Sequence, residues 1–189
     1  MTRYLTTILF LLPLWRNWVI HLHVHTRYST GDALASSKKL AQKISSMGPD
    51  PVLGITDHDN MSGIVDHHKA CRAHGVKPVY GMEVTTDAGN HLTLLAKNEV
   101  GLKNLFRLSK TDKSYEDLSR YRTGVVALSG DLSGAIPLSI LKRDKKELNF
   151  HLSALHNIYR RDFYLEIIDH GLREQKRVND VLEKIDLPK

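Results

Sequence analysis

Residues 18–26 alternate apolar side chains with histidines, and this pattern constrains the fold more than any other stretch of the chain. A period of two is typical of an extended strand, in which alternate side chains share a face. His21, His23 and His25 would therefore point the same way. Imidazole is the commonest protein ligand for metal ions, which favours a metal site; the alternative is a half-buried strand with a histidine-rich polar face. Because one strand supplies too few ligands, the rest of the chain must supply the others.

Size, charge and cysteine content limit the possible classes of protein. The 189 residues suffice for one domain with a full hydrophobic core but not for two sizeable ones. Contents of 41% apolar and 25% charged residues are ordinary for a soluble globular protein. The net charge of +6 is compatible with a polyanionic partner such as nucleic acid, although many basic proteins bind none. The lone cysteine, Cys71, excludes an intrachain disulfide, fits a reducing cytosol and is expected to pack within a helix.

The first 16 residues are predicted to form an apolar extension of a domain that occupies residues 17–189. A charge near the start and a short apolar run are shared with signal peptides, but no small-residue cleavage pattern follows. The run is also far shorter than the roughly 20 residues of a transmembrane helix. We therefore expect an extension that packs on the domain, or a start codon placed too far upstream, and no membrane partner.

Strand and helix patterns alternate along the rest of the chain, which predicts an α/β fold built from parallel units. Strands are expected over residues 52–55, 76–85, 91–96, 124–129 and 163–168, and helices over 33–47, 61–74, 99–109 and 174–185. Residues 115–122 are polar and carry no clear pattern. The charge run at 142–147 is expected to be a solvated face or a helix start rather than a DNA contact.

Several histidines and carboxylates lie at the carboxyl ends of the predicted strands, where loops of α/β proteins gather side chains from distant positions. These residues are His23, His25, Asp32, His58, Glu83 and His170. His91 is an exception because it opens its strand, and the helical His67, His68 and His74 are expected to lie on the surface or to pack. Mixed nitrogen and carboxylate ligands suit zinc, manganese or iron, and a bridging glutamate would suit two or more ions.

Five strings of residues closely resemble the PHP (polymerase and histidinol phosphatase) domain family. They are His23-Val-His25-Thr26, Ile55-Thr-Asp-His58, Gly81-Met-Glu83, residues 91–98 and Leu165-Glu-Ile-Ile-Asp-His170-Gly171. The likeness covers about residues 17–189, and segments 57–63 and 75–83 favour the branch found in bacterial DNA polymerase III α subunits over the histidinol phosphatases. The resemblance implies a distorted seven-stranded α/β barrel, similar to a TIM barrel, with up to three divalent ions at the carboxyl ends of its strands.

The resemblance also implies a role for each residue that matches a family motif. The implied metal ligands are His23, His25, Asp32, His58, Glu83, His91 and His170. Asp57 would be a supporting or catalytic carboxylate, and Glu83 would bridge ions and take part in catalysis. His21 matches a position outside the ligand set.

The chemistry that the resemblance implies is phosphoester hydrolysis, in which two or more ions acidify a bound water and stabilise the leaving alkoxide. The implied substrate is a DNA 3′ end, as for a proofreading 3′-5′ exonuclease, and the implied partners are polymerase domains and replisome subunits. Two alternatives stay open. One is a catalytically silent replisome scaffold or truncated relic, and the other is a free-standing phosphatase acting on a small phosphoester such as histidinol phosphate.

The sequence departs from the family pattern in three places. The family completes its site with an aspartate and a histidine after one more strand, which would lie beyond Lys189. The closing strand and two ligands are therefore expected to be missing, as in a fragment, a split gene product or a degraded gene. Asp59 and Ala33 replace two family glycines, and the first change is mild because aspartate tolerates a left-handed backbone.

Overall fold

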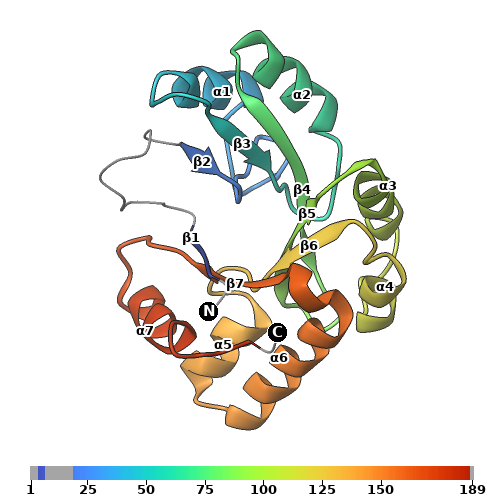
Figure 1. Ribbon diagram of the computed structural model, residues 1–189, viewed down its shortest axis with the longest axis vertical. Coiled ribbons are helices and arrows are strands. Elements are labelled where there is room, and N and C mark those ends of the chain that lie inside the picture. Colours follow the sequence, from blue (N-terminus) through green and yellow to red (C-terminus); the bar gives the residue numbers. More distant parts are fainter. Residues whose placement is uncertain (1–3, 7–18, 188–189) are drawn as a thin grey trace.

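The computed structural model describes residues 4–6 and 19–187, whose strands form one curled sheet with the helices around its outer side (Figure 1). The strands are β1 (Tyr4–Thr6), β2 (Ile20–His21), β3 (Val52–Ile55), β4 (Lys77–Thr85), β5 (His91–Ala96), β6 (Val125–Leu128) and β7 (Phe163–Ile167). The helices are α1 (Ser37–Ser45), α2 (Ile64–Ala73), α3 (Glu99–Leu108), α4 (Tyr115–Arg120), α5 (Ala135–Lys142), α6 (Lys145–Tyr159) and α7 (Arg173–Leu182), with a 3-10 turn at Arg160–Asp162. The predicted mixture of α and β elements is confirmed.

The sheet is a curved half-barrel of β2 to β7, to which β1 adds three residues at one edge. The strand order is β1-β7-β6-β5-β4-β3-β2, and β1 runs parallel to β7 with Tyr4 opposite Leu165. Within the described residues no ladder joins β1 to β2, so the closed seven-stranded barrel stays a prediction. Most of the predicted extension, together with Trp18, lies outside the described residues. No helix in the described ranges combines the length and the apolar character that crossing a membrane requires.

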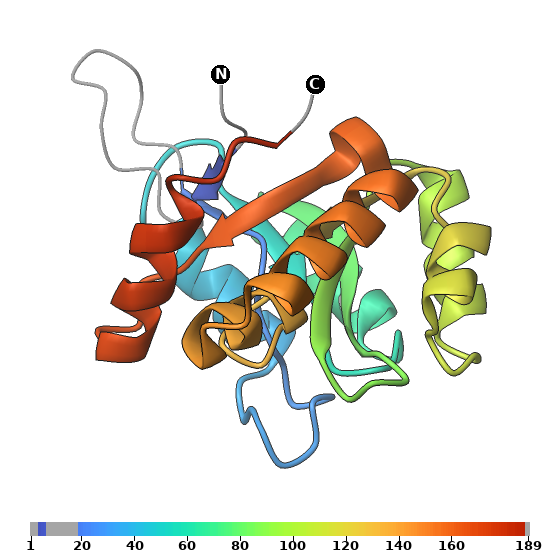
Figure 2. The ribbon, with the colours of Figure 1, turned by 90° about the horizontal axis from the view of Figure 1, so that it is seen from below.

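β5 runs antiparallel to both β4 and β6, which differs from the parallel units expected from the sequence. The connection from β4 is a turn over residues 86–90, in which the Thr86 N–H donates to the Asn90 carbonyl at 2.8 Å. A parallel crossover needs about a dozen or more residues, so this connection can only make a hairpin. The reversal puts His91, the first residue of β5, opposite Thr85, the last residue of β4. His91 therefore lies near the carboxyl ends of the parallel strands. The β4–β5 turn and the loop after β2 project on the same side of the sheet (Figure 2).

The histidine-rich stretch forms a much shorter strand than its alternation predicts. Only Ile20–His21 pairs with β3. His23 and His25 lie in the extended segment that follows, where Val24 and Thr56 still exchange hydrogen bonds. The Val24 N–H donates to Thr56 Oγ1 at 2.8 Å, and the Thr56 N–H donates to the Val24 carbonyl at 2.9 Å. These bonds keep the segment extended beside Thr56. His23 and His25 therefore both approach Glu83, although neither belongs to the paired strand.

Gly54 allows the histidine segment to lie directly against β3. A Cβ at this position would overlap the backbone carbonyl of Leu22. We expect Gly54→Ala to lower the free energy of unfolding by about 2 to 3 kcal/mol, because backbone cannot move aside as a flexible side chain would. Urea unfolding followed by circular dichroism measures the change. Gly89→Asn is the control: Gly89 has φ +79°, which asparagine tolerates, and no atom lies within 4 Å of its added Cβ. Equal losses in the two variants would contradict the prediction.

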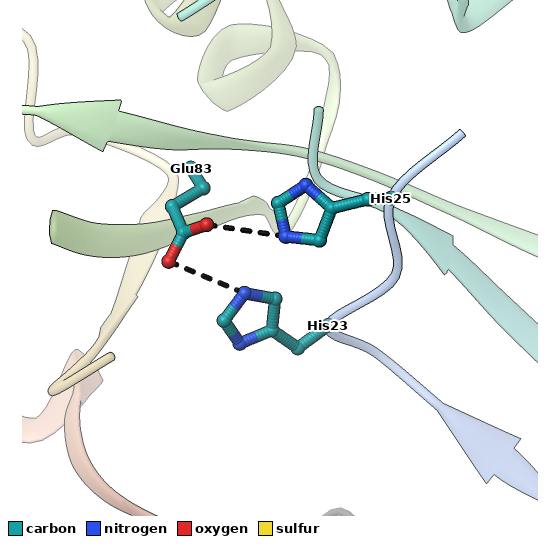
Figure 3. Close-up of side chains that lie close together, drawn as sticks. All are labelled: His23, His25 and Glu83. Carbon is teal, nitrogen blue, oxygen red and sulfur yellow. Dashed lines mark ion pairs between the residues drawn. The ribbon is translucent and has the colours of Figure 1, made fainter. Parts of the chain in front are cut away.

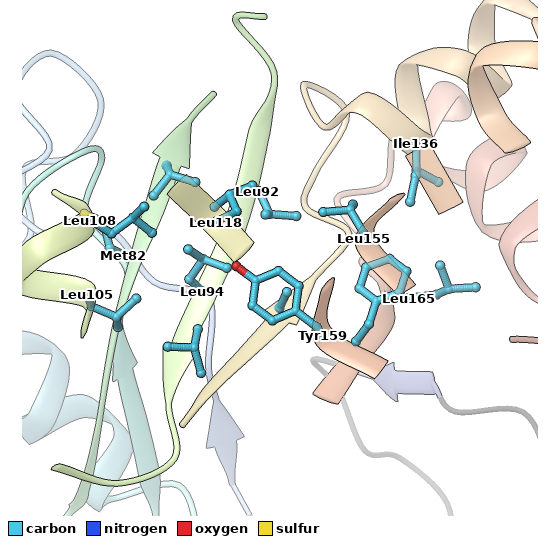
Figure 4. Close-up of a cluster of buried hydrophobic side chains, with 14 of the residues drawn as sticks. Met82, Leu92, Leu94, Leu105, Leu108, Leu118, Ile136, Leu155, Tyr159 and Leu165 are labelled. Atoms are coloured by element: carbon cyan, nitrogen blue, oxygen red, sulfur yellow. The ribbon is translucent and has the colours of Figure 1, made fainter. Parts of the chain in front are cut away.

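Two apolar clusters hold the helices against the sheet. The larger one joins β3 to β7 with the helices from α2 to α7 and contains Met82, Leu105 and Leu165 (Figure 4). The smaller one packs α1 and α2 on β3 and contains Cys71. Burial raises the pKa of the Cys71 thiol to about 11, which fits the predicted packing role. His67 is also buried, and its Nε2 donates to the Leu53 carbonyl at 3.0 Å.

Asp59 has a left-handed backbone, with φ at 54°, a conformation that aspartate tolerates. Its carboxylate accepts a hydrogen bond from the Thr85 N–H at 2.9 Å and lies 3.3 Å from Lys113 Nζ. The Asp59 N–H donates to the Glu83 carbonyl at 2.8 Å. Asp59 therefore ties the loop after β3 to the end of β4.

Candidate metal centre

Glu83 lies at the centre of a ring of four histidines. It belongs to β4 and is 1% exposed. Its carboxylate oxygens lie 3.3 Å from His23 Nε2 and 3.1 Å from His25 Nε2 (Figure 3). They also lie 3.4 Å from His58 Nδ1 and 3.6 Å from His91 Nδ1. A buried carboxylate is stable only with compensating partners, and here the partners come from three separate segments of the chain.

The loop after β2 brings a second carboxylate to the other side of this ring. Asp32 Oδ2 lies 3.5 Å from His25 Nδ1 and 3.8 Å from His58 Nε2, and its side chain is half-exposed. Ser29 Oγ lies within hydrogen-bond distance of His25 Nδ1, at 3.0 Å. His25 and His58 therefore each stand between Glu83 and Asp32.

Asp57 holds this loop in place through buried hydrogen bonds and does not line the cavity at the site. It is 1% exposed. Its Oδ1 accepts hydrogen bonds from the Thr26 N–H at 2.6 Å and from Ser29 Oγ at 2.8 Å, and its Oδ2 accepts one from Thr26 Oγ1 at 2.7 Å. The carboxylate thus fixes the turn that connects His25 to Asp32.

Glu166 and Asp131 belong to the site, although the sequence analysis did not single them out. Glu166 is 1% exposed, and its Oε1 lies 3.0 Å from His23 Nδ1. A single carboxylate inside the otherwise apolar run at 163–168 was the available signal. Asp131 lies 3.8 Å from His91 Nδ1. It follows β6 at its carboxyl end, so the strand-end argument applied to it as well.

All seven predicted ligands line one cavity of about 380 Å³ at the carboxyl-end edge of the parallel strands. They are His23, His25, Asp32, His58, Glu83, His91 and His170, and four further residues complete the lining: Asp131, Ser133, Glu166 and Ile168. His170 is exposed and follows β7. The curl of the sheet therefore gathers residues that are far apart in the sequence.

The donor atoms of this cavity fit divalent metal ions. Three groups have ligand atoms within 4.8 Å of one another: His23 with His25 and Glu83, His25 with Asp32 and His58, and His58 with Glu83 and His91. Among the described residues, three buried atoms here have no hydrogen-bond partner: Glu83 Oε1, His91 Nδ1 and Glu166 Oε2. Buried polar atoms are normally paired, and a cation between Glu83 and the imidazoles would satisfy the first two.

The charges at the site shift two pKa values in opposite directions. Burial would lower the pKa of His23, but the nearby carboxylates of Glu166 and Glu83 raise it to about 10. Burial would raise the pKa of Glu83, but His23 and His25 hold it well below its usual range. At neutral pH, protein stripped of metal therefore holds a protonated imidazole between two carboxylates.

Metal affinity is expected to rise with pH. An ion needs the neutral imidazole of His23, whereas the proton stays on this ring up to a pH of about 10. Each ion bound at His23 should therefore release about one proton, and its affinity should rise about tenfold per pH unit between pH 6.5 and 8. Titration calorimetry with Mn²⁺ in buffers of different ionisation enthalpy measures the released protons.

Glu166→Gln provides the control for this proton release. Glutamine keeps the size of the side chain but removes one of the two charges that raise the pKa of His23. The variant should release fewer protons at the same pH, because less of His23 is protonated before the ion binds. Proton release that is absent from the native chain, or equal in both proteins, would contradict the expected competition.

Sequence comparison identifies related proteins. The family model described as PHP domain matches residues 21–170. DNA polymerase III subunit alpha of Thermus aquaticus is 36% identical over 87% of this chain, and that of Treponema pallidum is 33% identical over 86%. This chain spans only 16% of the length of either relative.

Structural comparison gives a weaker likeness. A Bifidobacterium adolescentis protein provisionally described as a metal-dependent phosphoesterase matches 75% of this chain and 50% of its own, at 16% identity and a TM-score of 0.38. An amidohydrolase from Chromobacterium violaceum matches the same shares at 21% identity and a TM-score of 0.37. TM-scores this low do not establish a common fold. The assignment of this chain to a family therefore depends on the sequence comparison.

Proposed function

Because the chain belongs to the PHP domain family, we propose that it is a metal-dependent phosphoesterase module of a DNA polymerase III α-type protein, acting on the 3′ end of a DNA strand. The observation that carries the proposal is the buried carboxylate of Glu83 among four imidazoles. Such a concentration of imidazoles around a buried carboxylate is typical of a metal site. The relatives named as DNA polymerase III subunit alpha support the polymerase branch of the family.

The two oxygens of Glu83 support a bridging role for this residue. Oε1 faces His23 and His91, whereas Oε2 faces His25 and His58. The carboxylate would therefore be able to hold more than one cation, in keeping with its place in two of the three ligand groups. We assign the remaining contacts to Asp32 and His170. Zinc, manganese and iron all suit this mixture of imidazole and carboxylate.

The bound ions would supply Lewis-acid charge, which acidifies water and neutralises phosphate oxygens. The residues of the chain would orient the imidazole and carboxylate groups that hold these ions. Glu166 accepts the Nδ1 proton of His23 and so keeps its Nε2 directed at Glu83, and Ser29 restrains the ring of His25 in the same way. Asp57 acts indirectly, because it holds the loop between His25 and Asp32 in place.

We also propose that the sheet is part of a distorted seven-stranded barrel and that polymerase and replisome subunits are the partners. The curl of β2 to β7, and the seventh strand position that β1 occupies beside β7, support the barrel. The polymerase relatives support the choice of partners.

The test is degradation of a 5′-labelled single strand by the Mn²⁺-loaded chain, resolved one nucleotide at a time on a gel. We expect shortening from the 3′ end only, no shortening when the 3′ end is blocked, and none with a His23→Ala protein purified in parallel. Hydrolysis of histidinol phosphate without attack on DNA would favour the phosphatase alternative. Bound metal with no hydrolysis of either substrate would favour the scaffold.

A further inference from the structure

A second cavity of about 420 Å³ lies between the start of α1, the exposed face of α2 and residues 27–28 of the loop after β2. It shares no lining residue with the cavity at the metal centre. Its volume falls within the roughly 300 to 1,000 Å³ of typical ligand sites. The charged and polar groups around it indicate which kind of ligand it can take.

The start of α1 borders this cavity with polar residues. The first N–H groups of a helix have no partners within the helix, and they favour a bound anion. Ser36 caps the helix by accepting from the Lys39 N–H at 3.3 Å. Ser37, the first helical residue, lines the cavity and is 4% exposed, and its Oγ has no hydrogen-bond partner within the described ranges. A buried hydroxyl without a partner is costly, and a ligand oxygen would satisfy it.

The side chains around the cavity carry a surplus of positive charge. Lys38 and Lys69 line it and are exposed. Asp66 is the carboxylate of the lining, but it accepts hydrogen bonds from the Tyr28 hydroxyl at 2.7 Å and from Arg27 Nη2 at 3.2 Å. Its charge is therefore compensated by Arg27, which leaves the two lysines to attract an anion.

We propose that this cavity, the α1 pocket (Ser37, Lys38 and Lys69), binds a backbone phosphate of the nucleic-acid strand whose 3′ end is processed at the metal centre. The proposal deepens the proposed function and rests on it for the identity of the strand. One loop joins the two sites: residues 27 and 28 line the α1 pocket, while Ser29 contacts His25. A phosphate contact positions the strand without reading its sequence.

The test compares two variants of α1 that lose the same charge. Lys38→Gln removes an ammonium from the pocket, whereas Lys39→Gln removes one from the next residue, which is exposed and does not line it. Binding of a fluorescein-labelled single-stranded 12-mer is measured by anisotropy in EDTA, where metal-dependent hydrolysis is suppressed. We expect Lys38→Gln to weaken binding about fivefold and to reduce the slope of log affinity against log salt by about 0.7, with little change for Lys39→Gln. Ser37→Ala should weaken binding about threefold.

The ligand side of the contact is tested with 12-mers that carry one neutral methylphosphonate at successive linkages from the 3′ end. One linkage should weaken binding of the native chain about fivefold and have no further effect on Lys38→Gln. Equal affinities of the two lysine variants, absence of a sensitive linkage, or inorganic phosphate competing as well as the strand would each overturn the proposal.

The proposals for the α1 pocket and for the metal centre can be disproved independently of each other. Hydrolysis of bis(p-nitrophenyl) phosphate by the Mn²⁺-loaded chain tests the metal centre alone, and Lys38→Gln should leave it unchanged. Hydrolysis of this diester by a chain that does not bind the 12-mer would overturn the pocket but not the phosphoesterase. A strand that binds in the expected way to a chain without hydrolytic activity would overturn the phosphoesterase but not the pocket.

Discussion

Glu83→Gln should remove metal binding and phosphoester hydrolysis together. Glutamine keeps the shape of the side chain but takes away the charge that four imidazoles share. Loss of an outer partner of a metal ligand already costs 10- to 100-fold in metal affinity, so loss of the bridging carboxylate should cost more than about 100-fold. Metal content of the dialysed protein and the rate of 3′-end shortening measure the two effects.

The matched control is Glu99→Gln, which also removes one carboxylate charge. Glu99 is exposed at the start of α3 and pairs only with Lys103 one turn away, at 2.7 Å, among the described residues. An exposed pair of this kind contributes little to stability. The control should keep its metal content and its activity. A Glu83→Gln protein that still holds two ions per chain would contradict the bridging role.

The period-two pattern at residues 18–26 predicted that His23 and His25 share a face, and both approach Glu83, but it gave the wrong length of strand. Alternation reports which side chains share a face, and it does so for any extended backbone, paired or not. Whether the backbone stays in a ladder depends on the neighbour, and here β3 approaches closely enough to require glycine at position 54. A single sequence does not carry that information.

His91 and Glu166 differ in whether the sequence alone could have placed them at the site. The short turn at residues 86–90 was enough to predict a hairpin, and a hairpin would have placed His91 at the edge of the site. Glu166 is different, because its contact with His23 joins β7 to the segment that follows β2, at the other end of the half-barrel. Such a contact depends on how strongly the sheet curls, which strand patterns do not specify.

Capping side chains mark two helix starts that the apolar pattern alone did not define. Asp144 lies in the charge run at 142–147 and caps α6, since its carboxylate accepts from the Lys146 and Glu147 N–H groups at 3.0 Å. The run is therefore a helix start, which was one of the two expected outcomes. α4 was left unassigned because it is polar, although Ser114 caps it by accepting from the Asp117 N–H at 3.2 Å.

Asp57→Ala should destabilise the chain by about 3 kcal/mol and loosen the loop that carries Asp32. The substitution leaves the buried Thr26 N–H, Thr26 Oγ1 and Ser29 Oγ without their acceptor, and unpaired buried donors cost about 1 to 3 kcal/mol each when the site relaxes only in part. Urea unfolding of metal-stripped protein measures the loss. A change below about 0.5 kcal/mol would show that the three hydrogen bonds are not maintained in solution.

Asp57→Asn separates a positioning role from a catalytic one. Asparagine keeps one acceptor and the size of the side chain, so the fold should survive while the loop holds Asp32 less firmly against His25 and His58. If Asp57 only positions the loop, hydrolysis should be lost through weaker metal binding and should return when Mn²⁺ is raised to saturation. If Asp57 takes part in the reaction, saturating metal will not restore the rate. We expect rescue, because the carboxylate is buried beneath the loop and does not line the cavity where a phosphoester would bind.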